Sequence, residues 1–75
     1  SLYNNNLSNI PDSIGNLSKL EYLYLHYNNL TSLPESIGQL SNLKELWLSN
    51  NNLNKQEQDK IKRLLPNTTI DGLDS

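Results

Sequence analysis

Leucines recur along the chain with two spacings, and each spacing predicts a different local structure. In residues 22–26 (YLYLH), leucine alternates with polar or amphipathic residues, which is the period-two pattern of a β-strand with one buried face. The following aliphatic residues are three or four positions apart: Leu30, Leu33, Ile37 and Leu40. Among them, Pro34 fixes the backbone and Gly38 allows a tight return. The pattern predicts short strands joined by compact connecting segments.

The whole pattern repeats after 23 residues. Residues 20–30 (LEYLYLHYNNL) recur as residues 43–53 (LKELWLSNNNL), an offset of 43 − 20 = 23. Each coil of such a repeat carries about half a dozen aliphatic side chains, which one coil cannot bury alone. We therefore expect neighbouring coils to stack, with their strands parallel and side by side.

These residues resemble the leucine-rich-repeat family, whose consensus LxxLxLxxNxL is met at every fixed position of both copies. The segments 10–17 (IPDSIGNL) and 33–40 (LPESIGQL) are similar to the LPxxIGxL class of bacterial and of intracellular Ras-linked repeat proteins. The resemblance covers essentially the whole chain. It implies an α/β fold, a right-handed solenoid with a parallel concave β-sheet and short 3₁₀ or extended convex segments.

The repeat gives way to a different pattern after Leu53. Asn54, with Glu57 three residues on, reads as a helix cap, and an apolar stripe at helical spacing follows: Ile61, Leu64 and Leu65. Pro66 ends this helix, and three basic residues off the stripe are expected to be solvated: Lys60, Lys62 and Arg63. The segment resembles the C-terminal cap of cysteine-free repeat proteins.

The start of the chain lacks such a cap. We expect a single domain fragment, residues 1–75, made of a truncated repeat (1–19), a full repeat (20–42), the last repeat strand (43–53) and the C-terminal cap (54–75). Further repeats are expected before residue 1. Without them, the first coil would expose an apolar patch that favours a homo-oligomer: Leu2, Leu7, Ile10, Ile14 and Leu17.

Asparagines repeat together with the leucines. Asn5, Asn28 and Asn51 stand where the chain leaves each strand and turns. An amide at this point can satisfy backbone groups that the turn leaves unpaired. An exposed polar recognition ladder is the alternative interpretation.

All the aromatic residues occupy variable positions of the strand segments, which point outward from the leucine core. With the polar residues beside them on adjacent strands, they form the candidate partner-binding surface: Tyr3, Tyr22, Tyr24, His26, Tyr27, Glu45, Trp47, Ser49 and Asn50. Tyrosine and tryptophan are enriched in binding hot spots. Cross-strand packing that stabilises the sheet is the alternative explanation.

Composition narrows the chemistry further. The net charge is −2, which gives no electrostatic reason to expect nucleic acid, and no apolar run approaches the length of a membrane span. There is no cysteine and a single histidine, His26. We expect no metal, no cofactor and no enzymatic activity.

The sequence therefore favours a protein–protein interaction module that binds through the concave sheet. The alternative is a structural stacking or capping piece of a longer or engineered repeat array, with no ligand of its own. Four Asn-x-Ser/Thr triplets begin at Asn6, Asn16, Asn29 and Asn67. A chain rich in these residue types forms such triplets freely, and the cysteine-free cap favours an intracellular or bacterial location over a glycosylated extracellular one.

Overall fold

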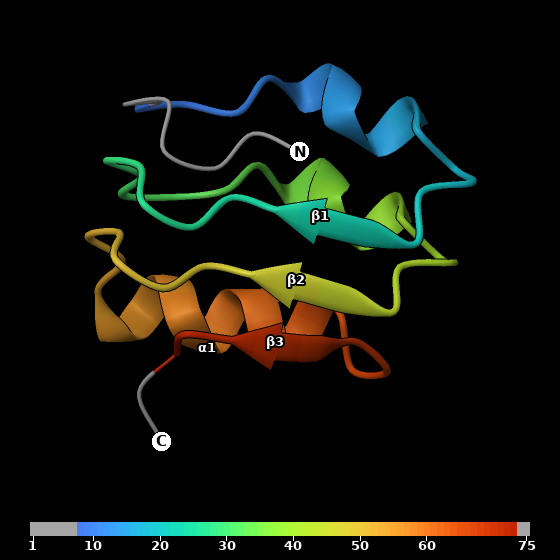
Figure 1. Cartoon of the computed structure of the whole chain (residues 1–75). Helices are drawn as coiled ribbons and strands as arrows, with labels where there is room; N and C mark the ends of the chain where they lie inside the picture. Colours follow the sequence, from blue (N-terminus) through green and yellow to red (C-terminus); the bar gives the residue numbers. More distant parts are fainter. Residues whose placement is uncertain (1–7, 74–75) are drawn as a thin grey trace.

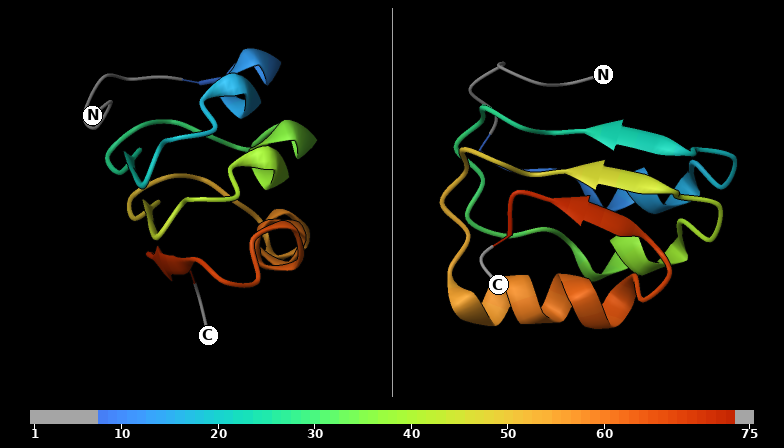
Figure 2. Two further views of the ribbon diagram at one scale, coloured as in Figure 1. Left: turned by 90° about the vertical axis from the view of Figure 1, so that its right-hand side faces the viewer. Right: turned by 60° about the horizontal axis from the view of Figure 1, so that its bottom comes forward.

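The computed structural model describes residues 8–73. Within them the elements follow in the order η1 (Asp12–Asn16), β1 (Tyr22–Tyr24), η2 (Glu35–Gln39), β2 (Glu45–Trp47), α1 (Lys55–Leu64) and β3 (Thr69–Asp71), where η denotes a 3₁₀ helix. The strands form one layer, and η1, η2 and α1 form a second layer behind them (Figures 1 and 2). Each coil of the chain runs through both layers, which is the solenoid that the repeat predicts.

The sheet is parallel, with the strand order β1-β2-β3. The register places Leu23 beside Leu46 and Leu46 beside Ile70. Strand β1 is shorter than the predicted segment 22–26 and ends at Tyr24. Backbone pairing nevertheless continues past it, since the Leu25 amide donates to the Trp47 carbonyl over 2.9 Å and the Tyr27 amide donates to the Ser49 carbonyl over 3.0 Å.

The leucines of the repeat form the core between the two layers. Within residues 8–73, eight aliphatic side chains are less than 2% exposed: Leu25, Leu30, Leu33, Ile37, Leu40, Leu46, Leu48 and Ile61. At about 25 cal/mol per Å² of apolar surface, their burial is the main favourable contribution to folding. The predicted sandwiching of side chains between coils is confirmed.

Two of the repeating asparagines, Asn28 and Asn51, bind backbone groups at the turns, as predicted, and Asn5 lies outside the described residues. Asn28 Nδ2 donates to the Leu25 carbonyl over 2.9 Å. Asn51 donates to the Leu48 carbonyl within its own coil (3.0 Å) and to the Leu25 carbonyl of the coil above it (2.9 Å). Its Oδ1 accepts from the Leu30 amide over 3.0 Å. Asn51 therefore satisfies backbone groups of two coils at once.

The repeating glycines, Gly15 and Gly38, allow close packing between coils rather than the tight return that the sequence suggested. Both lie inside 3₁₀ helices. A Cβ on Gly15 would lie 2.7 Å from the Ser36 carbonyl oxygen, and one on Gly38 would lie 3.3 Å from Leu64 Cδ2. Glycine is used here because adjacent coils approach each other closely on the helical side of the solenoid.

Helix α1 covers the last coil, as the cap pattern predicts. The Asn54 side chain accepts from the Glu57 amide over 2.9 Å at its N-terminus. On the inner face, Ile61 and Leu65 are buried and Leu64 is half-buried against Gly38. The helix therefore replaces the 3₁₀ segment of the two coils above it (Figure 2).

One expectation for this helix is wrong. Lys60 was expected to be solvated, but its side chain is only 22% exposed. Its ammonium donates to the Leu33 carbonyl over 2.8 Å and pairs with Glu57 over 2.9 Å. The methylene stem of a lysine can cover apolar surface while its ammonium reaches a polar partner, and here that partner is a backbone carbonyl of the preceding coil.

Candidate functional site

The solvent-facing surface of the sheet displays the side chains that alternate with the core leucines. In register across the strands, Tyr22 lies beside Glu45, and Tyr24 lies beside Trp47. The strands β1 and β2 run side by side at the front of Figure 1. Side chains two residues apart on one strand and directly opposite on the next share a face. The repeat therefore brings residues 23 positions apart into contact.

Among the described residues, five rings on this surface form one connected group, which we call the concave aromatic cluster: Tyr22, Tyr24, His26, Tyr27 and Trp47. The closest pair is Tyr24 and Trp47, whose ring centroids are 4.8 Å apart. His26 lies 5.3 Å from Trp47 and 5.4 Å from Tyr27. These are ordinary distances for tilted or edge-to-face aromatic packing.

The cluster remains accessible although its rings touch. Tyr22 is 45% exposed, Tyr27 is 54% exposed and Trp47 is 37% exposed. Trp47 is held in orientation because its Nε1–H donates to Glu45 Oε1 over 3.0 Å. The result is an apolar surface whose central ring is fixed by a neighbouring carboxylate.

Tyr27 has an unusual backbone conformation. Its φ is +60°, and Asn50, its equivalent 23 residues later, has a φ of +62°. Asparagine tolerates the left-handed region well, whereas it is uncommon for other non-glycine residues. Contrary to expectation, Tyr27 therefore lies in the turn after the strand. The backbone favours asparagine there, and the tyrosine ring packs against His26 with ring centroids 5.4 Å apart.

The remaining candidate residues extend the same surface. Ser49 is half-buried and Asn50 is exposed, both on the turn that follows β2. Tyr3 lies outside the described residues. The structure thus brings together Tyr22, Tyr24, His26, Tyr27, Glu45 and Trp47, with Ser49 and Asn50 at the edge nearest the turn.

Two residues of this surface were missed by the sequence reasoning. Thr69 and Asp71 of β3 are exposed and pair in register with Glu45 and Trp47. The interval from Glu45 to Thr69 is 69 − 45 = 24 residues, so these positions do not follow the 23-residue period. Alternation around the strand-like Ile70 was the signal that could have found them.

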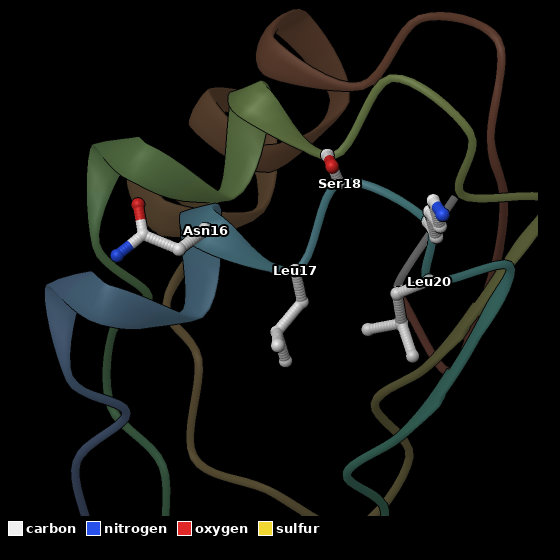
Figure 3. A pocket seen from close by; sticks show the side chains of 5 residues that line it. Asn16, Leu17, Ser18 and Leu20 are labelled. Carbon is white, nitrogen blue, oxygen red and sulfur yellow. The ribbon is translucent and has the colours of Figure 1, made fainter.

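The first coil carries a separate apolar feature. An open hollow of about 450 Å³ is lined by Asn16, Leu17, Ser18, Lys19 and Leu20, and Figure 3 shows the Leu17 and Leu20 side chains projecting to the same side. Leu17 is 50% exposed, as expected.

The other residues of the expected apolar patch are not exposed as predicted or are not described. Ile10 and Ile14 are only 7% and 8% exposed, because both side chains pack into the common core. The expectation that they face solvent is wrong. Leu2 and Leu7 lie outside the described residues.

Comparison with known proteins settles the family. The leucine rich repeat family matches residues 1–53, and a second leucine rich repeat match covers residues 42–68. The chain belongs to the leucine-rich-repeat family. Proteins of this family generally mediate protein–protein interaction, and their fold is typically non-enzymatic.

A solved structure agrees with the assignment. A leucine-rich-repeat protein of Leptospira interrogans is similar to this chain with a TM-score of 0.93 and 46% sequence identity. The likeness covers 95% of this chain and 18% of that protein, so this chain spans less than a fifth of its length. Among curated proteins, none matches the chain.

Residues 8–73 contain no group of three or more histidine or acidic side chains that could hold a metal ion. In the same part of the chain, no helix has the length and apolar character needed to cross a membrane.

Proposed function

We propose that this chain is a protein-recognition module that binds its partner through the concave aromatic cluster. The observation that carries the proposal is the exposure of three large rings, Tyr22, Tyr27 and Trp47, on one connected surface. Rigid aromatic side chains bury much area with little loss of rotamer entropy, which is why they dominate binding hot spots. The family's general role in protein interaction supports the same function.

Sheet packing explains only part of the cluster. It accounts for Tyr24 and Trp47, whose rings pack across neighbouring strands at 4.8 Å. It does not account for Tyr22 and Tyr27, which keep about half of their surface in water. If these rings served only to pack the sheet, they would be more fully buried, whereas a recognition surface leaves them exposed to solvent.

The test is a double substitution, Tyr24→Ala with Trp47→Ala. A partner is first isolated from the source cells and purified, and its affinity is then titrated against each variant. We expect the double variant to lose at least 100-fold in affinity while remaining folded, because these side chains lie outside the leucine core and each contributes about 1 kcal/mol or less to stability. Wild-type affinity in the double variant contradicts the proposal.

A matched control comes from the helical layer. Glu35→Ala with Gln39→Ala changes two exposed side chains of η2, on the side of the solenoid away from the sheet (Figure 2). This variant should bind as the wild type does. If it loses affinity and the aromatic double variant does not, the partner binds the helical layer instead.

A specific observation favours a second, structural role, the stacking of the first coil against another leucine-rich coil. Leu17 is 50% exposed, whereas Leu40, its equivalent in the next coil, is 1% exposed beneath the first coil. A leucine-rich coil covers Leu40, and a coil of the same kind would cover Leu17. For this chain alone in solution, an apolar surface that can cover Leu17 is the same open side of the first coil in a second copy.

Sedimentation equilibrium over a wide concentration range tests this role. The chain should form dimers at high concentration, and Leu17→Lys should restore the monomer because it places a charge on the apolar contact. Glu35→Lys is the control for an added positive charge elsewhere. A wild-type chain that stays monomeric throughout contradicts the stacking proposal and leaves the recognition function untouched.

A further inference from the structure

We propose that the concave aromatic cluster accepts arginine or lysine side chains of the partner protein, an inference that rests on the proposed function. The electronegative faces of tryptophan and tyrosine attract cations. Trp47, Tyr22 and Tyr27 offer such rings to solvent. The exposed rings of this surface can therefore bind a cation.

The charges around the rings are negative. The described residues of this face include two carboxylates, Glu45 and Asp71, and neither lysine nor arginine, on the three strands and the turns that follow β1 and β2. Lys44, which precedes Glu45 in the chain, pairs with Glu21 over 3.7 Å. The face therefore complements a positively charged group.

Both carboxylates lie close to Trp47. Glu45 Oε1 accepts from the indole Nε1–H over 3.0 Å, and Asp71 is the register neighbour of Trp47 on β3. A carboxylate can accept about four hydrogen bonds, so Glu45 retains capacity for a second donor. A guanidinium that stacks on an aromatic ring can thus reach a carboxylate at the edge of that ring.

The basic residues of the chain are concentrated elsewhere. Four of the six lie on α1: Lys55, Lys60, Lys62 and Arg63. This helix lies in the layer behind the sheet (Figure 2). Helix α1 carries these four cationic side chains against two carboxylates, Glu57 and Asp59, so a cationic segment is attracted to the sheet face in preference to this helix.

A neutral oligosaccharide is the competing occupant, because sugars also stack on aromatic rings beside carboxylates. The ring geometry favours the cation. Neighbouring rings are inclined to one another by 32–71°, so they form no continuous flat platform for consecutive sugar units. A compact cation requires only one exposed ring face and a nearby carboxylate.

Trp47 provides a site-specific readout, since it is the only tryptophan of the chain. The experiment follows its indole N–H resonance by NMR during titration with the peptide acetyl-Gly-Arg-Gly-Arg-Gly-amide. Two matched peptides carry citrulline, the neutral isostere of arginine, or glutamate in place of both arginines. We expect a saturable shift with the arginine peptide, at least 10-fold weaker binding with citrulline, and no shift with glutamate.

A pair of variants tests the carboxylate. Glu45→Gln keeps an acceptor for the Trp47 indole but removes the charge, and should weaken the arginine peptide about fivefold. Glu35→Gln removes one charge from η2 and should leave the affinity unchanged. Equal affinities for the arginine and citrulline peptides, or equal effects of the two variants, overturn the inference.

Cellohexaose serves as the oligosaccharide probe, and a Trp47 shift with this sugar but not with the arginine peptide also overturns the inference. The proposed function is judged separately. If the arginine peptide fails while Tyr24→Ala with Trp47→Ala still abolishes binding of the purified partner, the recognition function holds and only the cationic character of the partner is rejected.

Discussion

The first and second coils have nearly the same sequence motif but different surroundings. Leu17 and Leu40 close the segments IPDSIGNL and LPESIGQL, yet Leu17 is 50% exposed and Leu40 is 1% exposed. The second coil packs between the first coil and α1, whereas the described residues place no coil above the first. In a solenoid, the contribution of a leucine to stability depends on the coils that flank it as well as on its own coil.

The full repeat and the last repeat strand, residues 20–42 and 43–53, differ at the turn that follows the strand. Both turns place one residue at a φ near +60°, but that residue is Tyr27 in one coil and Asn50 in the next. The backbone is the same and the side chain differs. Comparing equivalent positions therefore distinguishes the residues that the fold requires from those that contribute to the exposed surface.

The largest difference between the coils should appear when the equivalent leucines are truncated. Leu40→Ala is expected to destabilise the chain by about 2–5 kcal/mol, because it removes a fully buried side chain and leaves a cavity. Leu17→Ala should reduce stability by less than about 1 kcal/mol, because half of this side chain is already in water. Urea denaturation at low protein concentration measures both.

Equal losses of stability at the two positions would contradict this prediction. They would mean that Leu17 is covered in solution. If its loss then grew with protein concentration, the covering surface would be a second copy of the chain.

Equivalent glycines should give the next largest difference. Gly15→Ala places a methyl group 2.7 Å from the backbone oxygen of Ser36, which cannot move aside without shifting the second coil. We expect a loss of about 1–3 kcal/mol. Gly38→Ala meets the Leu64 side chain at 3.3 Å, and this flexible neighbour should limit the change to about 0.5 kcal/mol.

Thermal denaturation of the two glycine variants checks this expectation. A Gly15→Ala variant as stable as the wild type would show that adjacent coils can separate locally. In that case, η1 and η2 would be able to move apart far enough to accommodate the added methyl group.

The repeat was enough to predict the solenoid, its parallel sheet and its capping helix. Alternating leucines, the 23-residue offset and the Asn54 cap are local signals, and each corresponds to the observed element. The contacts between coils were harder to predict. Lys60 reaches the Leu33 carbonyl across 27 residues, and no local pattern indicates that this lysine turns inward.

The candidate site was predicted to a similar extent. Period and alternation together placed Tyr24 beside Trp47 and Tyr22 beside Glu45. They did not include Asp71, because β3 follows a helix and departs from the 23-residue period. They also placed Tyr27 on the strand, since a left-handed residue in a turn is not visible in the hydrophobic pattern.

The equivalent turn residues give the comparison that is most informative about function. Tyr27→Asn gives the first turn the residue that the second turn has at Asn50, in the same left-handed conformation. We expect it to raise stability by about 1 kcal/mol, since asparagine adopts this region more readily than tyrosine. The reciprocal Asn50→Tyr should lower stability by a similar amount, and chemical denaturation of both variants measures the pair.

Partner binding should change in the opposite direction. Tyr27→Asn removes an exposed ring from the concave aromatic cluster, so its affinity for the purified partner should fall although the fold becomes more stable. Strained backbone at a recognition surface is maintained when the side chain it carries contributes to binding. A Tyr27→Asn variant that is more stable and binds normally would remove Tyr27 from the binding surface, leaving Tyr22, Tyr24 and Trp47 to account for recognition. A variant that is less stable than the wild type would show instead that the packing of Tyr27 against His26, with ring centroids 5.4 Å apart, outweighs the preference of the backbone.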